Sequence, residues 1–367
     1  MNQVKETVAL HHTPLSRMFR GDPFARFLWR VGITPVRAGL IMFAYGLIYA
    51  IILPAIFGRL TDVFQDWPTL VIILLITPVL LGYYAWEPFS IQNLYDGVAR
   101  RVREGQTEDE QIARLTRPLG RRIWFWLALL VGALESIYIV YQHSHSELSW
   151  QNFSPLIIAA VVPLRFIAFY AVAFILVREI ATLIGVNRFM SIFPIEVAPL
   201  HPDKAGGLRV LGRYVLARGI ILGLVGLLFG MNLLRSQLGR ESISGEFYLE
   251  MAIYALAAPT LFILPLWRAH ILMVDARDKI MLAVAQKFEQ QYYNSLEQIR
   301  SDATTEEHLG EIGALQKLYE IAEQAPAWPL DVRIVSQFSA AVLVPVFLPM
   351  AIDFVASLVN KALAFRF

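Results

Sequence analysis

Charged residues within long apolar stretches are the first places in this sequence where chemistry could occur. Glu135, Arg165, Arg218 and Asp353 each interrupt such a stretch. A charge inside a bilayer is costly unless it has a charged partner or lines a water-filled path. Glu135 and Arg165 fall in the outer halves of consecutive stretches, so we expect an ion pair that neutralises both side chains. A transport site built on these two residues is the alternative.

The last apolar stretch has the residue types of a pore-lining helix. Its polar and proline residues are Ser336, Gln337, Ser339, Pro345, Pro349 and Asp353. The two prolines free backbone carbonyls, which a membrane tolerates only where protein or water satisfies them. Carboxylates and backbone carbonyls select cations in channels, so the pattern predicts a cation pore with the aspartate at its outer mouth. An ordinary kinked helix with an interfacial aspartate is the alternative.

The fifth apolar stretch carries glycines on one helical face. They are spaced by four, three and four residues, at Gly219, Gly223, Gly226 and Gly230. Glycine lets another backbone approach closely, so the face predicts tight helix packing. A hinge or a narrow pore wall is the alternative, and in each interpretation the face is buried against protein.

A compact polar turn precedes that stretch and contains His201, Asp203, Gly206 and Gly207. Proline, aspartate and glycine at such a place are typical of a helix start. The alternative is a small anion or ion site, made by the two glycine amides with the histidine and aspartate at a helix N-terminus. The glycine pair lacks a full phosphate-loop pattern.

Metal ligands are restricted to histidine and carboxylates because the chain has no cysteine. His143, His145 and Glu147 alternate with small residues in an expected outer loop, where they could bind a divalent metal or sense external pH. A solvated loop is the other interpretation. Which metal, if any, would bind stays open, and we expect no organic cofactor.

A short motif follows the second apolar stretch. It consists of Asn93, Asp96, Gly97, Ala99 and Arg100. The motif resembles the opening half of the CDP-alcohol phosphotransferase signature, a family that transfers a phosphoalcohol and holds two metal ions on four aspartates. The resemblance implies a lipid phosphotransferase acting at a cytoplasmic helix end.

The chain then departs from that signature. Asn93 replaces the first aspartate, and Ala113 replaces the last. The next glycine, Gly105, comes too early, although Asp109 follows it at the interval that the family shows. Two carboxylates cannot place a metal pair as four do. Because the common hydrolase, phosphate-loop and dinucleotide motifs are also missing from the sequence, we expect no enzymatic activity.

The composition indicates which elements must position these residues. Of 367 residues, 56% are hydrophobic and 17% charged, and the mean hydropathy is +0.52, which predicts an all-α, multi-pass membrane protein. A formal charge of +2 gives no reason to expect nucleic acid as a partner. A span needs about 20 apolar residues. We expect about seven spans, at 38–57, 68–86, 123–141, 156–177, 211–234, 247–267 and 335–359.

The distribution of arginine and lysine predicts the orientation. If the N-terminus is cytoplasmic, nearly all basic residues outside the spans fall in inner segments, as the positive-inside rule requires. We therefore expect a plasma (inner) membrane protein with its N-terminus inside and its C-terminus outside. Aromatic residues alternate with arginines within 17–30, which indicates a short amphipathic helix at the inner interface.

The sequence divides into four regions on this basis. Residues 1–37 form a cytoplasmic N-terminus with the interfacial helix, 38–267 a six-helix membrane region, 268–333 a cytoplasmic helical hairpin, and 334–367 the seventh span with a short outer C-terminus. The hairpin is expected because apolar residues recur at spacings of three and four, with no helix breaker directly after Pro265. Its seams could pack on each other or against neighbouring subunits.

This layout resembles that of insect chemoreceptor-type channels, whose last helix lines the pore and whose cytoplasmic helices hold the tetramer. The similarity is one of topology, without a shared motif. The resemblance implies an oligomeric gated ion channel, with the lipid bilayer, further copies of the chain and ions or a small solute as partners. The alternatives are a secondary transporter with an intramembrane polar site and the lipid phosphotransferase.

Overall fold

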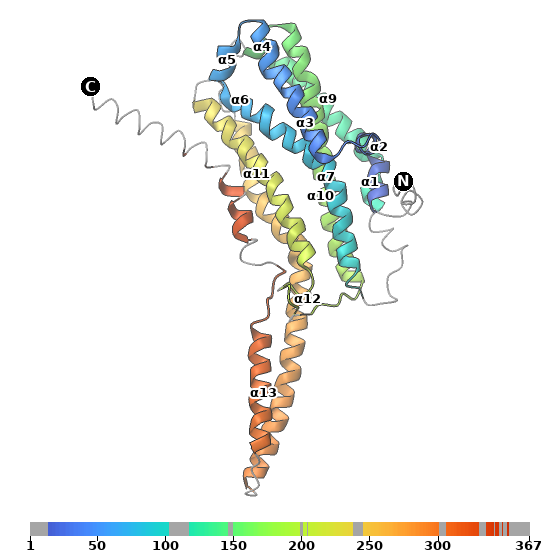
Figure 1. Cartoon of the computed structure of the whole chain (residues 1–367), viewed down its shortest axis with the longest axis vertical. Helices are drawn as coiled ribbons and strands as arrows, with labels where there is room; N and C mark the ends of the chain where they lie inside the picture. The colour runs from blue at the N-terminus through green and yellow to red at the C-terminus, as the bar shows by residue number, and fades with distance from the viewer. Residues whose placement is uncertain are drawn as a thin grey trace, which may run out of the picture.

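The computed structural model describes most of the chain. It covers residues 14–102, 117–145, 150–198, 201–203, 205–237, 245–300, 306–329, 335–340, 342–344, 347 and 351. These residues are helical or lie in connecting turns, apart from an isolated antiparallel bridge between Val102 and Ile195. The all-helical prediction is therefore confirmed for the described part of the chain (Figure 1).

Six helical segments of this part are long and apolar enough to cross a membrane. They are Pro35–Ile56, Trp67–Ala99, Ile123–Tyr141, Pro155–Ile192, Arg209–Ser236 and Phe247–Asn294. Each overlaps a predicted span, which supports an integral membrane protein. The seventh span stays a prediction, because only a shorter apolar helix, Val335–Val344, is described there.

Two short helices precede the first span. Helix α1 covers Pro14–Gly21 and α2 covers Pro23–Arg30. Asp22 separates them, and its carboxylate accepts hydrogen bonds from the backbone amides of Phe24 and Ala25, so it caps α2. Met18, Ala25 and Leu28 are buried against the bundle. Phe27 and Trp29 of the same segment are exposed, so protein covers only part of its apolar surface.

The first two spans run side by side through close backbone contact. The first consists of α3 (Pro35–Leu47), the π-helical turn η2 (Ile48–Ile52) and α4 (Leu53–Ile56). After α5 (Leu60–Gln65), the second consists of α6 (Trp67–Val71), η3 (Ile72–Ile76) and α7 (Thr77–Ala99).

Glycines allow α3 and α7 to approach. A Cβ on Gly39 would lie 3.1 Å from the Pro78 carbonyl oxygen, and one on Gly82 would lie 3.1 Å from that of Pro35. This close approach of two backbones is the role that small residues have in membrane helices.

The third and fourth spans form the other side of this bundle. After η4 (Arg117–Gly120), helix α9 covers Ile123–His145, and after η5 (Trp150–Asn152), α10 covers Pro155–Ile192. At 38 residues, α10 is about 57 Å long, nearly twice the thickness of the hydrocarbon core. The residues that follow the predicted span, 178–192, therefore belong to the same continuous helix.

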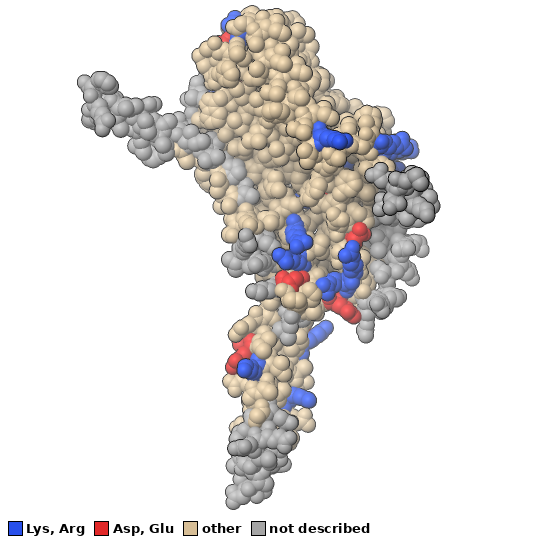
Figure 2. Space-filling view, in the orientation of Figure 1, with Lys and Arg blue, Asp and Glu red and all other residues tan. Residues whose placement is uncertain are grey.

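The remaining helices extend the molecule in one direction. Helix α11 covers Arg209–Gln237, α12 covers Gly245–Arg300 and α13 covers Glu306–Glu323. The 56 residues of α12 form one helix that continues past its apolar part, and α13 lies alongside that extension (Figure 1). On the face shown in Figure 2, most of the coloured Lys, Arg, Asp and Glu side chains lie over the lower part of the molecule, and the upper bundle shows few of them.

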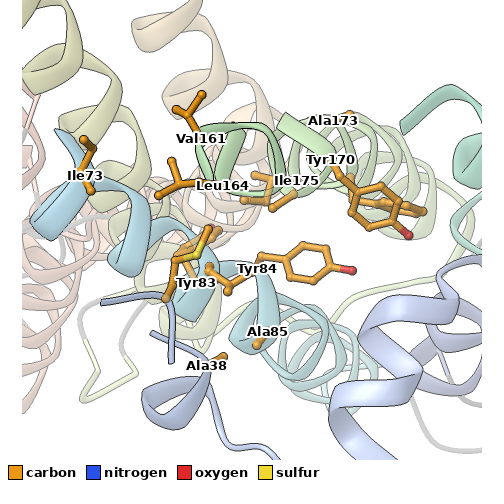
Figure 3. Close-up of a cluster of buried hydrophobic side chains, with 14 of the residues drawn as sticks. Ala38, Ile73, Tyr83, Tyr84, Ala85, Val161, Leu164, Tyr170, Ala173 and Ile175 are labelled. Carbon is orange, nitrogen blue, oxygen red and sulfur yellow. The ribbon is translucent and has the colours of Figure 1, made fainter. Parts of the chain in front are cut away.

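Buried apolar residues form two clusters. One joins α2, α3, α7, α9 and α10, and it includes Tyr84, Tyr170 and Phe174. Figure 3 shows that the hydroxyl groups of Tyr84 and Tyr170 point to the same side, away from the aliphatic part of this cluster. The other cluster joins α7, α10, α11 and α12. Charged residues lie where α7, α10 and α11 meet.

Candidate functional site

Arg178 is the centre of a buried ionic network. Its Nη2 atom lies 2.5 Å from Asp22 Oδ2, and its Nη1 atom lies 3.1 Å from Glu87 Oε2. The Nη1 atom also donates to the Tyr84 carbonyl oxygen at 3.3 Å. The exposed fractions of the three charged side chains are 2%, 0% and 0%. One guanidinium therefore joins the N-terminal turn, α7 and α10.

A second arginine continues the network on α11. Arg218 Nε forms an ion pair with Glu179 Oε1, and Arg218 Nη1 donates to the Tyr83 hydroxyl at 2.6 Å. Tyr83 and Tyr214 each donate to Glu179, at 3.2 and 3.3 Å. The guanidinium also lies 3.7 Å from the ring centre of Tyr214, which is a cation–π contact.

We refer to these charged residues together as the central charged cluster. Its members are Asp22, Glu87, Arg178, Glu179 and Arg218. Glu87 is within electrostatic range of both arginines and of Glu179, so the two halves form one electrostatic unit. Glu179 is its most exposed side chain, at 16%.

The formal charges of the central charged cluster do not balance when every member is ionised. Three carboxylates face two guanidinium groups, which leaves one negative charge in excess. Arginine does not lose its proton in proteins, so a compensating charge must come from a proton or another cation. An uncompensated charge in a low-dielectric interior is strongly unfavourable.

The hydrogen bonds differ among the three carboxylates. Asp22 accepts from the hydroxyls of Tyr84 and Tyr170 at 2.5 and 3.0 Å, in addition to Arg178 and two backbone amides. Glu179 accepts from two tyrosines and pairs with Arg218. Glu87 accepts through Oε2 alone, and its buried Oε1 has no hydrogen-bond partner among the described residues.

The predicted pair of Glu135 and Arg165 lies elsewhere, between α9 and α10. Their nearest charged atoms are 3.6 Å apart, and the side chains are 18% and 33% exposed. Close packing of the two helices brings them together, because a Cβ on Gly132 would lie 3.0 Å from the Phe166 carbonyl oxygen. The third intramembrane candidate, Arg218, belongs instead to the central charged cluster.

The four candidate glycines of α11 are all buried in the bundle. A Cβ on Gly219 would lie 2.9 Å from the Phe338 ring, so this glycine admits the helix that begins at Val335. Gly223, Gly226 and Gly230 are buried further along the same helix.

The His201 turn satisfies its own polar groups. The backbone amides of Ala205 and Gly207 donate to Asp203 Oδ1 at 3.0 Å, and His201 Nδ1 lies 2.8 Å from the same oxygen. Burial raises the pKa of the Asp203 carboxyl, but these hydrogen bonds outweigh it and the net pKa is lowered.

Two glycines with positive φ and the side chain of Arg101, which follows α7, also belong to this turn. Gly206 and Gly207 have φ of 62° and 86°, the left-handed region that favours glycine. Arg101 Nη2 lies 3.2 Å from His201 Nε2. Because the Gly207 amide already has a partner within the turn, this geometry favours the structural interpretation over an anion site.

Several other predicted residues lie at exposed or undescribed positions. Asn93 and Asp96 are exposed on α7, Arg100 is exposed directly after it, and Asp96 accepts a hydrogen bond from Gln92 at 2.7 Å. The remaining positions of that motif, Gly105, Asp109 and Ala113, lie outside the described residues. Within the described part of the chain no three His, Asp or Glu side chains are grouped to hold a metal.

The predicted pore helix is described at its start. Ser336 and Gln337 are exposed and Ser339 is partly buried, whereas Pro345, Pro349 and Asp353 lie outside the described residues. In the expected outer loop, α9 extends through His143 and His145, and Glu147 is outside the described residues.

An ion pair at the opposite end of the bundle was not predicted. Asp66, between α5 and α6, lies 3.3 Å from Arg235 Nε of α11 and accepts a hydrogen bond from the Trp150 indole at 3.2 Å. This pair is balanced, and it fastens the start of the second span to the end of the fifth.

Glu87, Arg178 and Glu179 were not predicted because two predicted spans end too early, and Asp22 was not predicted because it lies outside every predicted span. Glu87 follows directly after the predicted 68–86 span, and Arg178 follows directly after the 156–177 span. Hydropathy marks where apolar residues end, while helix α7 continues to Ala99 and α10 to Ile192. The three charged residues directly beyond these span ends, Glu87, Arg178 and Glu179, were the available signal.

Comparison of the chain with protein-family models, characterised proteins and solved structures finds no match.

Proposed function

We propose that this protein is a secondary transporter in which the central charged cluster couples the movement of an ion to that of a solute. The observation that carries the proposal is the charge imbalance of that cluster, with three carboxylates against two guanidinium groups. Ionisable residues within membrane bundles mark ion pathways and proton relays. A purely structural network has no need of an unbalanced carboxylate.

The predicted topology places the cluster near the cytoplasmic boundary of the membrane. With a cytoplasmic N-terminus in a plasma (inner) membrane, the segments beginning at Trp67 and Pro155 run inward. Glu87 and Arg178 then lie about 30 and 35 Å from the outer ends of their segments, comparable with the thickness of the hydrocarbon core. In this orientation the α12 extension and α13 form the cytoplasmic hairpin, and a seventh span follows it.

The ion pairs of the central charged cluster join different helices, so an exchange of partners could accompany the helix movements of alternating access. Arg178 and Arg218 stand on different helices, and each pairs with carboxylates that neighbouring elements supply. Exchange of these partners would let α10 and α11 adopt two arrangements. Such discrete rearrangements of packed elements underlie conformational switching.

An oligomeric channel is the second candidate, and exposed apolar side chains favour it. Phe288 and Tyr292 on the α12 extension are 36% and 49% exposed, and Leu318 and Tyr319 on α13 are 49% and 37% exposed. Neighbouring copies of the chain would cover these side chains, as the helices of an oligomer do. The pore helix would be the predicted seventh span.

Cysteine accessibility distinguishes the two functions without knowledge of the solute, because the natural chain has no cysteine. Ser90 is 8% exposed and lies one turn after Glu87 on α7, so Ser90→Cys places a unique thiol beside the cluster. Inside-out and right-side-out vesicles are treated with a membrane-impermeant maleimide, with and without a pH gradient. Gln286→Cys, at an exposed position of α12, reports vesicle orientation.

The outcomes differ for each function. We expect the Ser90→Cys thiol to react from one side at a time, with the reactive side changing when the pH gradient is imposed. If the thiol reacts from both sides at once, the result would contradict a transporter and favour an open pore. A thiol that reacts from neither side under any gradient would leave the cluster as a structural ion-pair network and contradict the proposal.

A further inference from the structure

We propose that Glu87 carries a bound proton, and that this proton is the ion that the central charged cluster exchanges. The inference names the coupling ion of the proposed transporter and rests on that function for its role. The presence of the proton itself can be measured independently of transport.

Hydrogen bonding identifies which of the three carboxylates is protonated. An ionised carboxylate only accepts hydrogen bonds, and it requires several donors when buried. Asp22 accepts from five donors and Glu179 from three groups, counting its ion pair. Both therefore have the surroundings of an anion.

Glu87 has different surroundings. Arg178 is its one hydrogen-bond donor among the described residues, and that donor contacts Oε2. The other carboxyl oxygen, Oε1, is buried without a hydrogen-bond partner among those residues, in a side chain that is 0% exposed. Placing the proton on Oε1 removes the excess charge and leaves Oε2 free to accept from Arg178.

The neighbours of Glu87 also supply the electrostatic reason. The titratable and charged groups within electrostatic range of Glu87 come from α7, α10 and α11: Tyr83, Arg178, Glu179, Tyr214 and Arg218. Arg178 is already paired with Asp22, and Arg218 with Glu179. These two carboxylates offset part of the positive potential that the arginines produce at Glu87. A third negative charge is then incompletely compensated.

The geometry points to a proton and not to a metal ion. Sodium or a divalent cation takes several oxygen ligands. No group of three or more potential His, Asp or Glu ligands occurs in the described part of the chain. A proton needs one oxygen, and the unpartnered Oε1 provides it.

Infrared spectroscopy of the purified full-length protein tests this assignment. A protonated carboxyl group has a carbonyl stretching band that an ionised carboxylate lacks, and the band shifts on exchange into deuterium oxide. We expect the wild-type protein at neutral pH to show this band for one buried carboxyl group per chain. Glu87→Gln should lose the band, and Glu135→Gln, the control at another intramembrane acid, should keep it.

Each other result contradicts the assignment. Absence of the band from the wild type at neutral pH, or its persistence in Glu87→Gln, would overturn it. Loss of the wild-type band on addition of NaCl at constant pH would assign the site to sodium instead. If Glu87→Gln does not fold, Glu87→Asp serves in its place: a displaced band supports the assignment and an unchanged one overturns it. Because no step involves solute movement, failure here is distinct from failure of the accessibility experiment.

Discussion

The central charged cluster and the Glu135–Arg165 pair are two ways to place charge within the same helix bundle. The pair joins two adjacent helices, its side chains are 18% and 33% exposed, and Glu250 of α12 also lies within electrostatic range of Glu135. The cluster joins the N-terminal turn with three spans, contains one carboxylate in excess and includes side chains of 0–2% exposure. Burial and the number of elements joined therefore separate a pair at a contact between two helices from a cluster suited to exchanging an ion.

Because the central charged cluster is more deeply buried than the Glu135–Arg165 pair, we expect the two to contribute differently to stability. Breaking a buried ion pair leaves a charge without compensation, whereas removing both partners together is often nearly neutral. The pair can be removed as a unit. The cluster cannot be made neutral by deleting one arginine with one acid, because an acid would remain in excess.

Replacement of the central guanidinium should have the largest effect. Arg178→Met leaves Asp22 and Glu87 buried without their cation, so we expect the free energy of unfolding to fall by about 3–5 kcal/mol. Unfolding in mixed detergent micelles with increasing sodium dodecyl sulfate measures this change. Arg188→Met, at an exposed position of the same helix, is the matched control. Equal effects of the two substitutions would contradict the central role of Arg178.

Removal of the Glu135–Arg165 pair should have a smaller effect. For the double variant Glu135→Gln with Arg165→Gln, we expect the free energy of unfolding to change by no more than about 1 kcal/mol. Asp22→Asn with Arg178→Gln removes one charge of each sign from the cluster and should destabilise the protein more. The same unfolding measurement compares them. A larger loss in the Glu135–Arg165 variant would reverse the comparison.

Replacement of Asp203, a carboxylate outside the membrane spans, should have the smallest effect on the free energy of unfolding. Asp203 accepts backbone hydrogen bonds, which lower its pKa in the folded protein. Its contribution is then complete above the ordinary carboxyl pKa and is lost as the pH falls through the lowered, folded-state pKa. We expect Asp203→Asn to reduce the free energy of unfolding by about 0.5 kcal/mol at neutral pH.

Unfolding measured as a function of pH checks this expectation. The difference between wild type and Asp203→Asn should shrink on acidification. Asp278→Asn, at an exposed position of α12, is the control for loss of one carboxylate. A difference that grows as the pH falls would have the wrong sign for a lowered pKa.

The sequence predicted the membrane helices better than it predicted the site. Six predicted spans overlap helices of the structure, and the buried glycine face of α11 was also predicted. Glu135 and Arg165 could be placed at similar depth because both lie inside strongly apolar runs. Arg218 was identified as a charge in need of a partner, but its partner Glu179 was not.

The N-terminal segment shows why the rest could not be predicted. Alternating arginines and aromatic residues indicate an amphipathic helix, and hydropathy cannot distinguish one that lies on lipid from one that lies on protein. In the structure, Asp22 interrupts the segment and reaches Arg178, 156 residues away in sequence. The aspartate itself looks like an ordinary N-cap, which it also is.

The sequence by itself determined that this protein is a bundle of apolar helices, because the hydrophobic effect and the length of a span act locally along the chain. It also determined which helix faces could approach, through the positions of glycine. Only the tertiary structure decided which charges meet. Pairing depends on where each helix ends and on how α7, α10 and α11 cross, and the excess carboxylate becomes evident once those partners are assigned.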